Sequence, residues 1–186
     1  ILETPATNNT RAYANIIWHY GRGLAYARKQ QPEAAKMELQ HIRDSMPSAL
    51  LHESPLAFNP GIAAVQIAEK ILEGVIAEEN KVYPLAIRLL EEAVNKETGM
   101  LYNEPRDWPH PARQYLGYAL LKAKQYAAAE KVYREDLMVN PNNVWSLTGL
   151  SDALQQQKKE KEAKKVQQQA KTTFSGGAAK ITGSVF

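Results

Sequence analysis

Apolar and small residues recur along most of the chain in runs that short polar or proline-containing turns separate. Pro47 and Pro141 predict the ends of two helical runs, because proline disfavours helix in the residue before it. Pro32 follows a turn and suits the first position of a helix, and Thr10 is a candidate N-cap. The pattern predicts eight helices, over about residues 11–29, 32–46, 61–79, 82–97, 111–124, 126–139, 143–157 and 159–174.

Small residues recur inside these runs at a fixed spacing, which indicates an internal repeat. Gly23, Gly74, Gly117 and Ser151 are each followed twelve residues later by an alanine, namely Ala35, Ala86, Ala129 and Ala163. In the first three copies a large apolar or aromatic residue follows at offset sixteen: Leu39, Leu90 and Tyr133. The last two copies are 34 residues apart, which is the length of two antiparallel helices with short turns. The small residues would let paired helices approach closely, and the large residue one turn further would fill the space between them.

The third copy carries the most complete pattern, Tyr115-Leu116-Gly117-Tyr118 followed by Ala129, Tyr133 and Asn140-Pro141. This pattern resembles the tetratricopeptide repeat. The resemblance covers about residues 16 to 175 and departs from the usual pattern at His19, Asp136 and Gln167. It implies an all-α fold, a right-handed solenoid of about four helical hairpins, in a family whose members mostly bind other proteins.

On this basis we expect one repeat domain over residues 1–175, with a C-terminal tail over 176–186. The repeat units fall at about 16–49, 67–97, 110–143 and 144–175. Insertions interrupt them at 48–60, which is apolar enough to pack, and at 98–109. The Gly- and Ser-rich tail has the composition of a flexible segment. Its apolar residues Ile181, Val185 and Phe186 suggest instead that a groove holds it, in this chain or in a neighbouring copy.

Composition limits the function classes. The chain has no cysteine, which excludes disulfides, thiolate zinc sites and thiol nucleophiles. A formal net charge of +3 is too small to indicate nucleic acid, and no apolar run is long enough to span a membrane. The basic run over 155–165 has interleaved acids, as in a polar capping helix. The chain begins at Ile1, which we take to mean a fragment or a processed product, either cytoplasmic or exported after signal removal.

The resemblance also implies where a partner would bind, because the first helix of each unit lines the concave face in this family. The implied partner-binding residues are Tyr20, Arg28, Tyr118, Lys122, Trp145 and Asp152. Other positions expected to be exposed on that face include Leu24, Ile71, Val75, Glu78 and Gln114. Exposed aromatic and arginine side chains suit protein binding. The alternative is that Tyr20, Tyr118 and Trp145 pack against adjacent helices or insertions.

The stretch 102–113 is the most unusual part of the chain, with two aromatics, two acids, two arginines, a histidine and three prolines. Its candidate site residues are Tyr102, Glu104, Arg106, Trp108, His110 and Arg113. Glu104, Asp107 and His110 could hold a metal or perform acid–base chemistry. In the structural interpretation, which we favour, Trp108 and Tyr102 fill a gap while Arg106 and Arg113 pair with carboxylates. A stiff loop of this kind also resembles segments of bacterial tetratricopeptide proteins of unassigned function.

The sequence contains no phosphate-binding glycine loop, helical His-x-x-x-His pair or Gly-x-Ser-x-Gly elbow. We therefore expect a scaffold that binds a protein or peptide in a concave groove, without catalysis, cofactor, metal or nucleic acid. Two alternatives stay open: a small-molecule or metal site on 102–113, with or without enzymatic activity, and the C-terminal interaction module of a larger protein.

Overall fold

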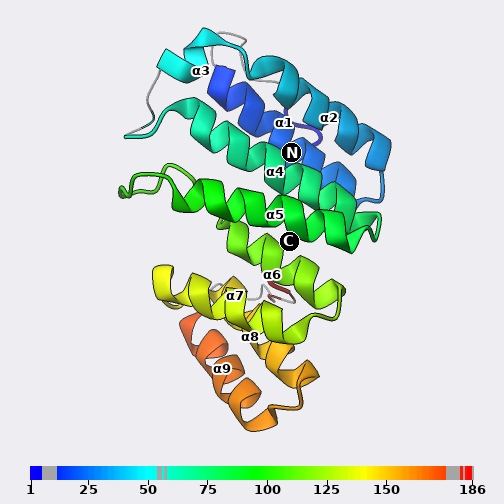
Figure 1. Ribbon diagram of the computed structural model, residues 1–186, viewed down its shortest axis with the longest axis vertical. Coiled ribbons are helices and arrows are strands. Elements are labelled where there is room, and N and C mark those ends of the chain that lie inside the picture. Colours follow the sequence, from blue (N-terminus) through cyan, green and yellow to red (C-terminus); the bar gives the residue numbers. More distant parts are fainter. Residues whose placement is uncertain (6–11, 54–55, 57, 175–180, 182, 186) are drawn as a thin grey trace. The chain divides into compact units, whose positions relative to one another are not determined.

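The protein is all-helical in the computed structural model, which describes residues 1–5, 12–53, 56, 58–174, 181 and 183–185 (Figure 1). These residues form nine helices and no strand: α1 (Ala12–Arg28), α2 (Pro32–Ser45), α3 (Ala49–Glu53), α4 (Gly61–Glu79), α5 (Tyr83–Thr98), α6 (Ala112–Lys122), α7 (Tyr126–Val139), α8 (Val144–Gln156) and α9 (Glu160–Thr173). The eight predicted helices are confirmed to within two residues at their described ends. Thr10 and Phe186, for which the sequence suggested roles, lie outside the described residues.

Four of the turns between helices have the same backbone conformation. Gln30, Lys81, Lys124 and Lys158 each have a φ close to +60°, the left-handed conformation that ends many helices. In each case the next residue donates its backbone N–H to a carbonyl five residues earlier, as in Gln31 to Tyr26 at 3.0 Å. Each of these residues follows Gly23, Gly74, Gly117 or Ser151 by seven positions. The predicted repeat is therefore visible in the backbone as well as in the sequence.

The chain divides into two compact units, residues 1–112 and 113–186. In the first unit, α4 packs against α1, α2, α3 and α5. It is buried on most of its surface, including Ile67, Ile71 and Leu72, which are 0% exposed. α3 was not predicted as a helix, but the expectation that this insertion packs is confirmed by Leu51, which is 1% exposed.

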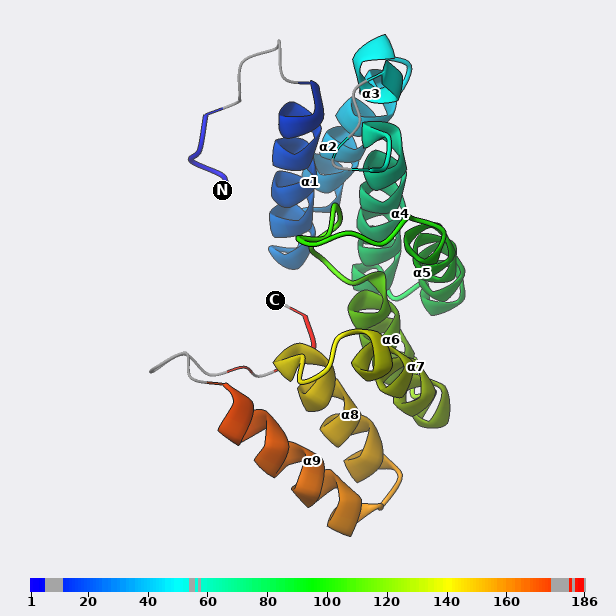
Figure 2. The same ribbon diagram turned by 90° about the vertical axis from the view of Figure 1, so that its left-hand side faces the viewer.

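Small residues do lie at helix contacts, although not always opposite the expected partner. A Cβ atom added to Gly74 would lie 2.7 Å from Leu90 Cγ, in agreement with the predicted pairing of small and large residues. At Gly23 the nearest side chain is that of Leu72 of α4, at 2.5 Å, a contact that the repeat did not predict. It arises because α4 packs against α1 (Figure 1 and Figure 2).

In the second unit a buried carboxylate, Asp136, fixes the turn between two helices. Asp136 is 1% exposed and accepts hydrogen bonds from Ser146 at 2.5 Å and Asn140 at 2.8 Å, with Asn143 at 3.2 Å. These bonds fix the turn from α7 to α8, where Asn143 also caps α8. The next hairpin closes as predicted, with the Ser151 hydroxyl donating to the Ala163 carbonyl at 3.3 Å.

Candidate functional site

The side chain of Tyr133 extends from α7 past α6 and α8, and its hydroxyl contacts the C-terminal tail. A Cβ atom added to Gly117 of α6 would lie 2.4 Å from Tyr133 Cζ, and one added to Gly149 of α8 would lie 2.2 Å from it. The hydroxyl end of the ring therefore lies between two helices, in space that only glycine leaves open. There the Tyr133 hydroxyl lies 2.5 Å from the hydroxyl of Ser184, and either can donate the hydrogen bond.

Both hydroxyls are removed from solvent. Tyr133 is 0% exposed and Ser184 is 1% exposed. Burial raises the pKa of Tyr133 well above its ordinary value; the hydrogen bond from Ser184 opposes this, and the charge of Asp152 adds to it. Tyr133 therefore stays protonated, and its hydroxyl acts as a neutral hydrogen-bonding group.

Two predicted partner-binding residues, Asp152 and Tyr118, act electrostatically on Tyr133, and two more lie beside them on α8 and α6. Lys122 lies over the ring of Tyr118, with its Nζ 5.0 Å from the ring centroid. Burial raises the pKa of the half-buried Asp152 carboxyl. Trp145 and Asp152 lie four residues before and three after Gly149, so helical spacing puts all three on one face of α8. We call Tyr118, Lys122, Trp145, Asp152 and the Tyr133 hydroxyl the Tyr133 face.

The predicted residues of the first unit serve its packing. Tyr20 is 3% exposed, so its expected exposure was wrong, and its ring packs edge-on against Trp108 with centroids 5.5 Å apart. Arg28 joins α1 to α4 through Glu78 and Glu79, at 2.7 and 2.5 Å. Other positions expected to be exposed are instead buried: Leu24, Ile71, Val75, Glu78 and, in the second unit, Gln114.

The two insertions are joined by a network of asparagine side chains that sequence reasoning missed. Asn59 donates to the Leu101 carbonyl at 2.9 Å and to the Asp107 carboxylate at 2.8 Å, and it accepts from the Leu101 N–H at 2.8 Å. Asn103 donates to the Pro105 carbonyl at 2.7 Å and to Asp107 at 3.0 Å. Both asparagines are buried, at 4% and 7% exposed. The presence of one asparagine, Asn59 or Asn103, in each insertion was the only signal in the sequence.

The acidic and histidine side chains of 102–113 do not converge. The Tyr102 hydroxyl donates to Glu104 at the surface, Asp107 is held by the asparagines, and the His110 ring lies 6.1 Å from that of Trp108. Over the part of the chain that the structure describes, no three His, Asp or Glu side chains are placed to hold a metal ion.

The remaining candidates of this stretch divide between the core and the surface. Trp108 fills a gap as expected, at 3% exposed, and its indole N–H donates to the His110 carbonyl at 2.5 Å. Tyr102 does not, because it is 70% exposed, with Arg106 5.6 Å from its ring centroid. Arg113 pairs with a carboxylate as expected, although loosely, at 3.9 Å from Glu135.

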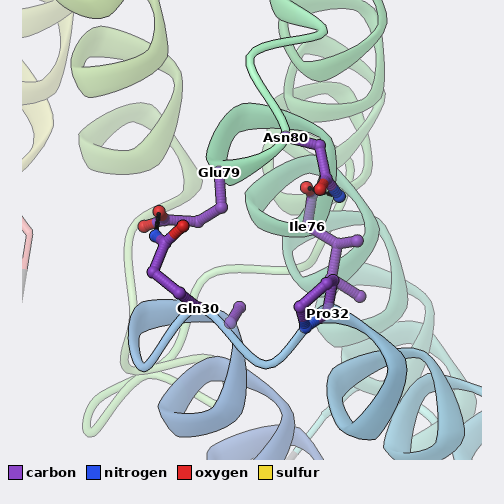
Figure 3. A pocket seen from close by; sticks show the side chains of 6 residues that line it. Gln30, Pro32, Ile76, Glu79 and Asn80 are labelled. Atoms are coloured by element: carbon purple, nitrogen blue, oxygen red, sulfur yellow. Dashed lines mark hydrogen bonds between the residues drawn. The ribbon is translucent and has the colours of Figure 1, made fainter.

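A hollow in the first unit is too small for a typical ligand. It encloses about 150 Å³ and is lined by Ala27, Gln30, Pro32, Ile76, Glu79 and Asn80. Figure 3 shows the Gln30 and Glu79 side chains turned toward one another and joined by a hydrogen bond. Small-molecule sites usually enclose roughly 300 Å³ or more. A second depression, over Lys158–Glu162, lies open on the surface at the turn between α8 and α9.

The structure thus defines an all-helical protein with a repeated turn and one face where a non-helical segment is held. Comparison of the chain with protein-family models, with curated proteins and with solved structures gave no match. Among the described helices, none has both the length and the apolar composition needed to cross a bilayer.

Proposed function

We propose that the second unit is a binding module for an extended peptide segment of a protein partner, which it takes up on the Tyr133 face. The observation that carries the proposal is the hydrogen bond between Tyr133 and Ser184, since a non-helical segment already lies against this face. Peptide binding of this kind is passive: a preformed surface supplies aromatic anchors and a few charges. The tetratricopeptide resemblance, which is most complete in this unit, supports the same function.

The composition of the face favours a peptide over a small molecule. Tyr118 and Trp145 offer large, half-buried aromatic surfaces, and Lys122 and Asp152 offer charges of opposite sign. Tyrosine and tryptophan are enriched where protein interfaces gain most of their free energy. A metal or enzymatic site on 102–113 is not proposed, because Glu104 and Asp107 are held by other groups of the loop.

The experiment compares two double variants in affinity capture followed by mass spectrometry. Tyr118→Ala with Lys122→Ala removes two groups of the Tyr133 face. The matched control, Lys131→Ala with Met138→Ala, changes exposed side chains of α7; Met138 is 75% exposed and the Lys131 side chain 78%. We expect the first variant to retain at most about a fifth of the partner captured by the wild type, a loss of about 1 kcal/mol.

The control should capture as much partner as the wild type, and the melting temperatures of all three proteins should agree. Equal capture by the wild type and by the Tyr118/Lys122 variant would remove the Tyr133 face from the proposal.

A further inference from the structure

The way Ser184 is held indicates what the Tyr133 face selects. Ser184 is 1% exposed, whereas its neighbours Gly183 and Val185 are half-buried. Among the described residues of this segment, Ser184 is the most deeply buried. Ser184 lies about ten residues beyond the end of α9 at Thr173 and contacts the same unit.

The surroundings of the Tyr133 hydroxyl favour a small side chain that carries a hydroxyl group. The Tyr133 ring lies directly against Gly117 and Gly149, where an added Cβ atom would collide with it, so helix backbone borders the hydroxyl on this side. Serine and threonine can donate to or accept from a neutral phenol, whereas a carboxylate can only accept. A carboxylate or phosphate would also lie near the negative charge of Asp152, which already acts on Tyr133.

We infer that the Tyr133 face recognises an extended segment with an unmodified serine or threonine beside an aliphatic residue, and that Ser184 with its neighbours Gly183 and Val185 is a built-in competitor for that segment. The inference rests on the proposed function and adds to it the chemistry of the partner and a form of autoinhibition. Gly183-Ser184-Val185 is then the protein's own example of the sequence that it binds.

Tethering makes the competitor effective. A segment joined to its site by a short connection acts as if present at about millimolar concentration. A partner must displace it, so the apparent affinity is reduced by the fraction of molecules whose face is free. If the tail is bound in about 90–99% of molecules, releasing it strengthens partner binding about 10- to 100-fold.

The test measures binding of a fluorescent synthetic peptide with the sequence of residues 181–186 to the full chain by fluorescence anisotropy. Ser184→Asp places a carboxylate against Tyr133 and Asp152 and should release the tail. We expect this variant to bind the peptide at least about ten-fold more tightly than the wild type does. Ser184→Ala, which removes only the hydroxyl, should give a smaller increase and serves as the second variant if the first does not fold.

Three controls make the result specific. Gln168→Asp adds the same charge at an exposed position of α9 and should bind the peptide as the wild type does. Adding Tyr133→Phe to Ser184→Asp should weaken binding several-fold, because the hydroxyl that meets the serine is gone. A peptide that carries phosphoserine at the position of Ser184 should lose binding.

Equal peptide affinity in the wild type and both Ser184 variants, absence of binding in all of them, or undiminished binding of the phosphopeptide would each overturn the inference. Partner capture that depends on Tyr118 and Lys122 but not on Ser184 would overturn it while leaving the proposed function in place.

Discussion

Two glycines of α1, separated by one residue, have opposite surroundings. A Cβ atom on Gly23 would lie 2.5 Å from Leu72 Cδ2, and Leu72 is 0% exposed. A Cβ atom on Gly21 would lie 3.5 Å from Ile1 Cγ1, an ordinary contact. Gly23→Ala should lower the free energy of unfolding by about 1–3 kcal/mol through overpacking. Gly21→Ala should raise it by up to about 1 kcal/mol, because alanine favours helix.

Urea unfolding followed by circular dichroism measures both variants, and each is the other's control. Equal midpoints for Gly21→Ala and Gly23→Ala would show that α4 does not crowd α1 at Gly23. The spacing of small residues predicted that such a contact exists. It could not show that Leu72 makes it, because this depends on how the first insertion brings α4 onto α1.

Protonation of His110 destabilises the folded state. Burial lowers its pKa below the ordinary value of 6.5. The unfolded chain therefore binds more protons than the folded chain just below that pH. The contribution of neutral His110 to the free energy of unfolding is thus fully present above pH 6.5 and is lost as the pH falls. We expect His110→Phe, which keeps a ring beside Trp108, to reduce the loss of stability between about pH 7.5 and pH 5.5.

Nuclear magnetic resonance titration of the wild type tests the same point directly. A His110 midpoint at or above 6.5 would contradict the prediction. The sequence placed His110 among metal or acid–base candidates. Its ring packs instead with Tyr20 and Trp108, and the contact with Tyr20 joins segments 90 residues apart, which no local pattern reports.

Among the helices, α7 is joined to the turn between α8 and α9 by the Glu130 carboxylate and by the Tyr126 carbonyl, which accepts from Gln157 at 3.2 Å. Glu130 accepts hydrogen bonds from Lys159 at 2.6 Å, Gln157 at 2.8 Å and Arg134 at 2.9 Å. Desolvation would raise the pKa of Glu130, but these bonds outweigh it and lower the pKa from 4.5 to about 2. Between these values the unfolded chain binds more protons, so the stabilisation is present above pH 4.5 and is lost as pH falls toward 2.

Glu130→Gln should therefore lower the free energy of unfolding by about 1 kcal/mol or less near neutral pH, since solvent screens these bonds. This difference between the two proteins should disappear as the pH approaches 2, where the wild-type carboxyl is protonated. Urea unfolding of both proteins at several pH values measures the difference, with Glu33→Gln as an exposed control in α2. A difference that stays constant down to the lowest pH would contradict the assignment.

The elements themselves were largely predictable from the sequence. Proline positions and apolar runs located eight helices, and the repeat anticipated the four similar turns at Gln30, Lys81, Lys124 and Lys158. The missed helix, α3, has only five residues, too few for a helical period to show in the sequence. The exposed face of α1 was predicted wrongly because the 102–113 loop and α4 cover residues that a regular repeat would leave open.

At the scale of the whole chain, the repeat was predictable and the contacts of its irregular parts were not. Repeat register follows from residues that recur at fixed offsets. The bonds from Asn59 to Asp107 and from Tyr133 to Ser184 each join residues about 50 positions apart, a spacing that the repeat does not contain. Whether such pairs meet depends on where the helices place both segments, so the sequence shows the groups without showing that they meet.

The contact between the tail and Tyr133 also predicts the molecular mass of the protein in solution. The apolar residues of the tail suggested that a groove of this chain or of a neighbouring copy holds it, and Ser184 bonds to Tyr133 of the same chain. Because the connection is short, the tethered segment outcompetes a second copy at micromolar protein concentrations. Light scattering after size-exclusion chromatography should give a mass of 20.8 kDa that does not change with concentration. Ser184→Asp should give the same mass; a wild-type dimer that dissociates on this substitution would mean that the tails are exchanged between copies.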